Sequence, residues 1–224
     1  MSTIESWVTL LKLRESEFDG LEYSTLQQKY VLLIATRISE LCLDAVLLLN
    51  QNRISSSPVI LRTALESYAD LSSCIKDPEH CHEMTKSFYW QLHEVSKGGD
   101  SESSDHYKSI GKYLPVNKRF SKAGLSDLFN GYYKVLSLHS HGNLSSLIEF
   151  HSEDNNAYLG TIAEDEKTIL LFEQATNLMA LCLRDTWEFF KISEHGIQQA
   201  QRIIDQINKT HNKPTHPTAY AAAD

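Results

Sequence analysis

The stretch from Ser24 to Asn50, STLQQKYVLLIATRISELCLDAVLLLN, carries a long amphipathic pattern. Its apolar side chains recur at the spacing of one face of an α-helix. The apolar positions are Leu26, Tyr30, Leu33, Ile34, Ile38, Leu41, Cys42, Ala45, Leu48 and Leu49. Because this apolar stripe is wide, we expect the helix to lie at the centre of the fold rather than at its surface.

Similar helical patterns lie on both sides of this stretch. A first helix is predicted after Ser2 or Thr3, and another starts at Ser55-Ser56-Ser57-Pro58, because serine caps a helix and proline is tolerated in its first turn. The helix that starts at Pro58 should end near Lys76. Further helices are predicted over about residues 79–97, 125–150, 164–187 and 193–207.

The segments between these helices read as connections. Gly98–Asp105 predicts a polar loop, and the chain from there to about Lys122 predicts one short helix and coil. We therefore expect an all-α, single-domain helical bundle of about six to eight helices over residues 1–208. Residues 209–224 have two prolines and no apolar period, which predicts a disordered C-terminal tail.

Composition indicates an ordinary globular protein. The chain has 224 residues, of which 42% are hydrophobic and 22% charged, and its net charge is -8. This charge argues against broad binding of duplex nucleic acid. The densest basic cluster is interpreted as solvated loop charges; it consists of Lys108, Lys112, Lys118, Arg119 and Lys122.

The cysteines and the N-terminus predict a cytoplasmic protein. The four cysteines include no CxxC pair, and Cys42, Cys74 and Cys182 stand among apolar residues, as buried thiols in a reducing compartment do. The first residues lack the basic and apolar regions of a signal peptide. No apolar run is long enough for a membrane span, so no membrane association is expected.

One predicted helix carries a polar row on a largely apolar surface. Arg62, Glu66 and Asp70 follow an i, i+4, i+8 spacing, so they lie on one face of the helix. Two interpretations remain open. The row is either a set of structural ion pairs or the polar wall of a functional site, and in both cases a buried charge needs a partner.

A second polar row lies on the helix that begins near Leu125. Asn130, Lys134, Ser137 and His141 return to one face, with Tyr133 beside them. A cation and a histidine so placed suit cleavage of an RNA phosphodiester. The histidine moves a proton to or from the ribose 2′-OH or the leaving 5′-oxygen, and the cation stabilises the charged phosphorane.

The alternative is that the same histidine and serine close a buried hydrogen-bond network with Arg62 and Glu66. We expect the two motif helices to pack together in either case, with Arg62 or Glu66 in hydrogen-bond reach of Ser137, His139 or His141.

Familiar metal and nucleotide motifs do not occur in the sequence: it contains no HExxH, P-loop, GxGxxG or GxSxG. His80-Cys81-His82 and His139-Ser140-His141 hold ligand-type residues, but nearby positions on a helix point in different directions. We therefore expect no metal site and no cofactor.

The two rows together resemble a known pattern. An Arg62-x3-Glu66 helix and a later helix with Tyr133-Lys134-x2-Ser137-x3-His141-Gly142 resemble an uncharacterised bacterial helical family, which is similar to the HEPN superfamily of helical nucleases and nucleotide-binding proteins. HEPN nucleases typically carry Arg-x(4–6)-His on a late helix. Here the matching stretch is Lys134-x6-His141, with lysine in the place of arginine.

The resemblance implies a HEPN-like fold and a metal-independent endoribonuclease. His141 would be the acid–base and Lys134 the phosphate anchor. The residues that would orient the substrate are Ser137, Tyr133 and Asn143, and the supporting residues are Arg62, Glu66, Asp70 and His139.

The resemblance also implies partners. HEPN proteins often form homodimers across the motif helix and serve in phage defence or toxin–antitoxin pairs, so a homodimer, an RNA or nucleotide ligand and an operon-encoded protein partner are expected. The long apolar stripes on Tyr30–Leu49 and Leu170–Trp187 also favour a homodimer. The alternative is a non-catalytic helical binding or regulatory protein, whose polar cluster is structural or binds a small nucleotide-like ligand.

Overall fold

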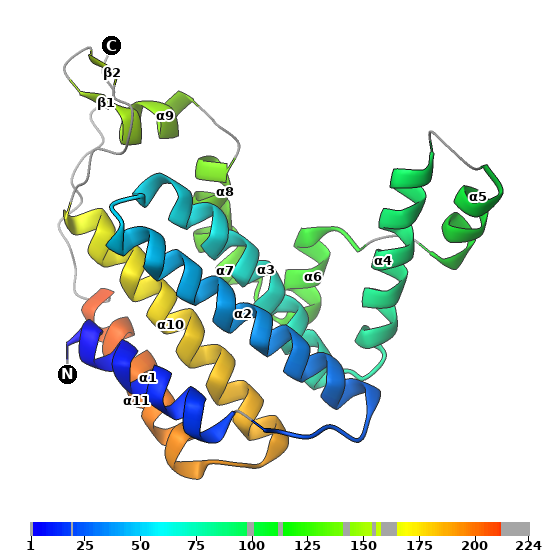
Figure 1. Cartoon of the computed structure of the whole chain (residues 1–224), viewed down its shortest axis with the longest axis horizontal. Coiled ribbons are helices and arrows are strands. Elements are labelled where there is room, and N and C mark those ends of the chain that lie inside the picture. Colours follow the sequence, from blue (N-terminus) through cyan, green and yellow to red (C-terminus); the bar gives the residue numbers. More distant parts are fainter. Residues whose placement is uncertain are drawn as a thin grey trace.

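Three long helices lie side by side at the centre of the molecule: α2 (Leu26–Asn50), α3 (Ser57–Lys76) and α10 (Asp165–Phe190) (Figure 1). The structure is a computed structural model and describes residues 2–18, 20–97, 101–111, 114–140, 144–153, 156–157 and 165–211. The facing side chains of the three helices are fully buried. They include Ala35, Ile38, Leu61, Ala64, Met179, Leu183 and Trp187.

Two helices cover α10 on the side away from α3. These are α1 (Thr3–Glu17) and α11 (Glu194–His211), which both contact α10 and lie beside it in Figure 1. Helix α1 begins with a capping box, in which the Ser2 hydroxyl accepts from the Glu5 amide at 3.2 Å and the Glu5 carboxylate accepts from the Ser2 amide at 2.6 Å.

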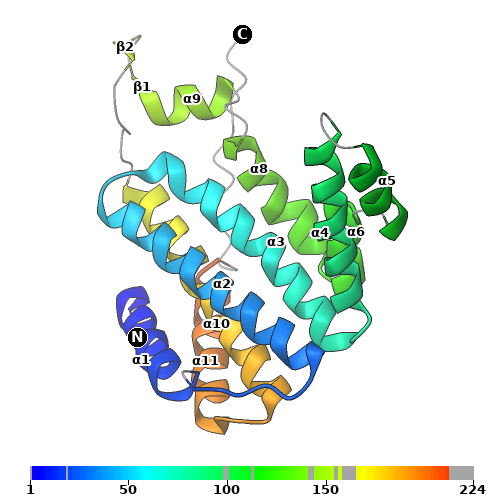
Figure 2. The same ribbon diagram turned by 45° about the vertical axis from the view of Figure 1, so that its right-hand side comes forward.

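Short elements complete the other side of the bundle. They are η1 (Ile54–Ser56), α4 (His80–Ser96), α5 (Ser101–Ile110), α6 (Val116–Ala123), α7 (Ser126–Leu128), the π-helical turn η2 (Phe129–Tyr133), α8 (Lys134–Ser140), α9 (Leu144–His151), β1 (Ser152–Glu153) and β2 (Asn156–Ala157). Helices α6 and α8 pack against α3, and α4 and α5 pack against each other at the far side from α1 and α11 (Figure 2). Strands β1 and β2 pair antiparallel.

The all-α class is confirmed, but the helices are more numerous than expected. The described residues form eleven α-helices, because the segment between α4 and α10 is divided into short pieces. Glycine contributes to this division. Gly124 adopts a left-handed conformation (φ 75°) after α6, and its amide donates to the carbonyls of Phe120 and Ser121, which ends the helix.

The predicted polar loop over Gly98–Asp105 is wrong from Ser101 onward, because these residues begin α5. Residues 98–100 lie outside the described part of the chain. Tertiary packing explains the difference: Ser104 is buried against α4, and its hydroxyl and its carbonyl each lie 2.9 Å from Nδ1 of His93. A polar sequence therefore forms a helix where a neighbouring helix provides partners.

The long helices follow the predicted ranges closely. The main differences are in the details of burial: in α2 the side chains of Leu26 and Leu33 are about half exposed (48% and 56%), whereas Val31 is fully buried. Helix α11 continues to His211, beyond the predicted end at Ile207. No helix in the described ranges is long and apolar enough to cross a membrane.

Candidate functional site

The polar row of α3 is partly buried at one end and more deeply buried at the other. The side chains of Arg62 and Glu66 are each 23% exposed, and Nε of Arg62 lies 3.4 Å from Oε1 of Glu66. Asp70, one turn further along, is buried. Because this row faces neighbouring elements rather than open solvent, its charges need partners from outside α3.

Tyr133, the last residue of η2, joins Arg62 to Glu66. Its hydroxyl accepts from Nε and Nη2 of Arg62 at 3.1 and 2.9 Å and donates to Oε1 of Glu66 at 2.8 Å. The guanidinium also lies 5.3 Å from the centre of the tyrosine ring. Burial and the nearby Glu66 carboxylate raise the pKa of Tyr133, while Arg62 opposes the shift, so the hydroxyl stays protonated and can donate.

Arg119, from α6, is the partner of Asp70. Its Nε donates to Oδ1 of Asp70 at 2.9 Å and its Nη2 donates to Oδ2, which makes a bidentate ion pair. The same Nη2 donates to the backbone carbonyl of Glu66 at 3.1 Å, and Nη1 lies 3.5 Å from Oε2 of Glu66. One guanidinium therefore links two turns of α3 to α6.

His80, the first residue of α4, completes the group around Asp70. Its Nε2 lies 3.2 Å from Oδ1 of Asp70, and the ring is 2% exposed. Burial alone raises the pKa of Asp70, but hydrogen bonds from His80 and Arg119 and the charge of Arg119 outweigh it and bring this pKa below its ordinary value. The carboxyl is therefore ionised at neutral pH.

A polar cavity of about 340 Å³ opens beside this group. Four members of the group line it, and α4 contributes further polar and aromatic side chains, among them Glu83, Ser87, Phe88 and Gln91. Nδ1 of His80, on the far side of the ring from Asp70, has no hydrogen-bond partner among the described residues. The cavity can accept a small ligand that offers hydrogen-bond donors to carboxylates.

The structure confirms that the two motif helices pack together, and of the three predicted partners only Ser137 and His139 can be checked, since His141 lies outside the described residues. In the described part of the chain, Arg62 and Glu66 contact Tyr133 and form no hydrogen bond with Ser137 or His139. The Ser137 hydroxyl instead donates to the carbonyl of Tyr133, at 2.8 Å within the same helical segment.

Two further predicted site residues that the structure describes, Lys134 and His139, make contacts outside this network. Lys134 is exposed, and its Nζ donates to Oδ1 of Asn130 at 3.0 Å. The ring of His139 packs against Phe150, with centroids 5.2 Å apart. Two predicted residues, His141 and Asn143, lie outside the described part of the chain.

The interpretation of Arg119 as a solvated loop charge is wrong. The residue is 9% exposed, because α6 places it against α3 while the adjacent Lys118 faces solvent. One signal in the sequence could have found it: Arg119 is the single arginine between Arg62 and Arg184. Arginine is the cation that proteins use for buried pairs with carboxylates.

The network as a whole is compact and close to neutral. Two guanidinium groups face two carboxylates, and a tyrosine and a histidine bridge the remaining acceptors. Among the described residues, no group of three or more His, Cys, Asp or Glu side chains is arranged to hold a metal ion. The charged and hydrogen-bonding groups of the network can bind and position polar atoms.

Comparison with protein families finds a similarity over part of the chain. Residues 93–158 match the model of a family of unknown function, DUF5677. This segment runs from the end of α4 to the strand pair, so it includes Arg119 and Tyr133 but not the α3 row. Neither curated proteins nor solved structures give a match.

Proposed function

We propose that the protein is a HEPN-like, metal-independent endoribonuclease whose site lies where α3 meets η2 and α8. The observation that carries the proposal is the position of Arg62, whose partly exposed guanidinium lies against Tyr133 at the start of the motif helix. The related motif has arginine where this chain has Lys134. Arg62 supplies that guanidinium from a neighbouring helix instead.

The roles of the residues follow from this assignment. Arg62 binds the scissile phosphate and stabilises the charge that develops on it, since a guanidinium can donate to two oxygens of one phosphate. Glu66 and Tyr133 hold the guanidinium in position. Lys134, exposed one residue further along, attracts the phosphate backbone.

His141 is the acid–base of this proposal, a role that rests on the sequence motif. Lys134 and His141 are two helical turns apart in that motif, so a histidine there can serve the same phosphate. His141 transfers a proton to or from the 2′-OH or the leaving 5′-oxygen. We propose that Ser137 and Asn143 contribute to substrate orientation, and that Asp70 and His139 support the site from behind.

We further propose that two copies join along the motif helix. Exposed large apolar side chains occur on α8, on α9 and at the start of α10; they are Val135, Leu138, Leu144, Leu147, Ile148, Ile169 and Leu170. Such patches are typical of partner surfaces. A homodimer of this kind brings two motif helices together, and its physiological setting is phage defence or a toxin–antitoxin pair with an operon-encoded partner.

The test is cleavage of labelled RNA by the purified full-length protein in the presence of EDTA. We expect His141→Ala to lower the rate by about 10²–10⁴-fold and Arg62→Ala by about 10²-fold, with little change in melting temperature for His141→Ala. Lys134→Ala should have a smaller effect, and Lys134→Arg should keep the activity. Arg37→Ala is the control, since Arg37 is an exposed arginine on α2.

An inactive wild-type protein would overturn the ribonuclease proposal. It would favour a second candidate, a non-catalytic protein that binds a small nucleotide-like molecule. The observation that favours this candidate is the acidic cavity beside Asp70, in which Arg119 is already engaged by Asp70 and Glu66. Carboxylates in the cavity can accept from the amino groups of a base, and Phe88 can stack on it.

Titration calorimetry with adenosine and AMP tests this second candidate. Both ligands should bind with similar affinity if the base alone is recognised. Phe88→Ala should weaken binding by about tenfold or more, because the stacking of a base on an aromatic ring is worth about 1–3 kcal/mol. Phe88 is 55% exposed, so this substitution should leave the fold intact.

A further inference from the structure

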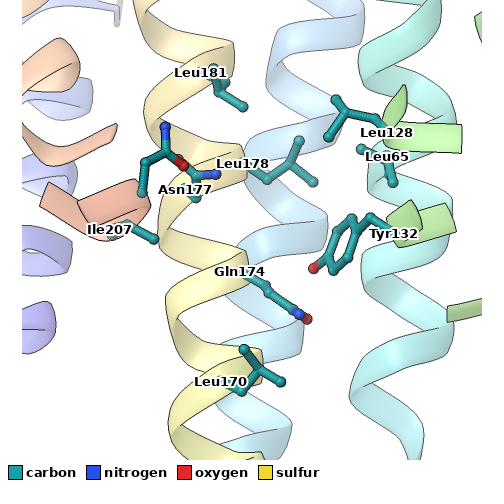
Figure 3. Close-up of a pocket in the computed structure, with 10 residues that line it drawn as sticks. Leu65, Leu128, Tyr132, Leu170, Gln174, Asn177, Leu178, Leu181 and Ile207 are labelled. Carbon is teal, nitrogen blue, oxygen red and sulfur yellow. The ribbon is translucent and has the colours of Figure 1, made fainter. Parts of the chain in front are cut away.

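A second pocket lies beside η2 and shares no lining residue with the cavity of the α3 network. It crosses α10 between α11 on one side and α7 and η2 on the other, as Figure 3 shows, and has a volume of about 240 Å³. Its walls are mainly apolar, with Leu65, Leu128, Leu178 and Ile207 contributed by four different helices. This pocket is separate from the site proposed above.

Three polar atoms in this apolar lining have no hydrogen-bond partner within the described residues. They are the hydroxyl of Tyr132, Oε1 of Gln174 and Oδ1 of Asn177, and each is shielded from solvent. In Figure 3 the side chains of Tyr132 and Gln174 extend into the space between α10 and η2. Buried polar atoms are almost always hydrogen-bonded, so three in one pocket indicate a missing partner.

The chemistry of the pocket limits what this partner is. None of the ten lining residues carries a charge at neutral pH, so a phosphate or a carboxylate would be buried there without a counterion. Burial raises the pKa of Tyr132 well above its ordinary value, so its hydroxyl remains a donor. The two carboxamide oxygens are acceptors. The ligand must therefore be neutral and offer both a donor and an acceptor.

A larger cavity of about 550 Å³ lies next to this pocket. The two share Tyr132, Leu170 and Gln174, and the larger one extends to His139, whose Nδ1 also has no partner among the described residues. Its other walls include apolar side chains of α8 and α10 and the ion pair of Lys167 and Glu149, so its lining is charged where that of the smaller pocket is not. The uncharged lining of the smaller pocket suits a molecule that has an apolar body and one compact polar group.

We propose that this pocket is a binding site for a small neutral molecule, largely hydrocarbon, that carries an amide or an equivalent donor–acceptor pair. The amide N–H donates to the carboxamide oxygen of Gln174 or Asn177, and the amide carbonyl accepts from Tyr132. The apolar part lies against the leucine walls. A protein helix is too wide for a space of this volume, and a nucleotide is excluded by its charge.

The experiment uses ligand-detected NMR on the full-length protein with two probes of similar shape, acetanilide and butylbenzene, of which only the first has an amide. We expect saturable binding of acetanilide with a Kd at or below about 1 mM. Tyr132→Phe and Gln174→Leu should each weaken it about 3–10-fold, the effect of one lost hydrogen bond, and leave butylbenzene binding unchanged. Tyr23→Phe, at an exposed tyrosine, should change neither.

Melting temperatures of the variants show whether weaker acetanilide binding comes from a less stable fold. Both pocket substitutions remove an atom without a partner, so they should leave the melting temperature equal or higher. The proposal is overturned if acetanilide does not bind saturably, if the two probes respond alike to Tyr132→Phe, or if that substitution lowers the melting temperature. RNA cleavage is measured separately, so failure here leaves the ribonuclease proposal untouched.

Discussion

Tyr132 and Tyr133 are neighbours in the π-helical turn, but their hydroxyls face two different regions of the molecule. The hydroxyl of Tyr133 is bonded to Arg62 and Glu66 in the α3 network. That of Tyr132 faces the pocket across α10 and has no partner among the described residues. A π-helical turn widens the helix locally, and such turns often occur at functional sites.

The two regions show that buried polar groups can serve either stability or ligand binding. In the α3 network each charge meets an opposite charge within the protein, so removing one member should cost stability. In the α10 pocket the polar atoms make no bond that folding needs, so removing one should cost binding and leave stability unchanged. Substitutions in the two regions can therefore test the comparison directly.

The largest effect is expected for Arg119→Ala. This change leaves the buried Asp70 carboxylate without its bidentate partner, which should lower the free energy of unfolding by about 3–5 kcal/mol. Urea denaturation followed by circular dichroism measures it. Arg37→Ala, in an exposed pair with Glu40, is the matched control and should cost less than about 0.5 kcal/mol. A loss below about 1 kcal/mol for Arg119→Ala would contradict the assignment of this network as structural.

A smaller effect, dependent on pH, is expected for Asp70→Asn. Because the folded pKa of Asp70 is depressed, its contribution is fully present above the unfolded value of about 3.9 and is lost as the pH falls through the folded pKa. At pH 7 the variant should be about 2 kcal/mol less stable than the wild type. This difference should shrink below about pH 4.

Urea midpoints measured between pH 7 and pH 2 check this expectation. The control is Asp44→Asn, at an exposed position of α2, which should show no such convergence. If the difference for Asp70→Asn stays constant over the whole range, the ionised form of Asp70 does not stabilise the fold.

Tyr133→Phe should have a moderate effect of about 1 kcal/mol. The hydroxyl links Arg62 to Glu66, but both partners are 23% exposed, so water replaces part of what is lost. A double-mutant cycle with Glu66→Gln should give a coupling of about 0.5–1 kcal/mol. Additive effects of the two substitutions would show that the tyrosine and the glutamate act independently.

The smallest effect is expected for Tyr132→Phe, whose stability should lie within about 0.5 kcal/mol of the wild type or above it. The stabilities of the Tyr132→Phe and Tyr133→Phe variants can be compared directly, because the same atom is removed at adjacent residues. Thermal and urea unfolding of both variants under identical conditions measure the difference. A loss above about 1 kcal/mol for Tyr132→Phe would mean that its hydroxyl has a partner that folding needs.

Part of the candidate site could be predicted because it depends on local geometry. The row of Arg62, Glu66 and Asp70 follows from helical periodicity, and so does the position of Tyr133 beside the second row. Periodicity did not identify which residues meet across helices. Tyr133, rather than Ser137 or His139, contacts Arg62, because the packing of α8 against α3 selects one face of each.

The sequence by itself determined the class of the fold and the extent of its long helices.

Only the tertiary structure decided which buried polar groups have partners. Arg119 and Asp70 are 49 residues apart in the chain and meet because α6 packs on α3. One step along a helix turns a side chain by about 100°, so Lys118 is solvated while Arg119 is buried, and this choice depends on the neighbouring helix. The same holds for Tyr132 and Tyr133, whose surroundings are set by α10 and α3 rather than by their own sequence.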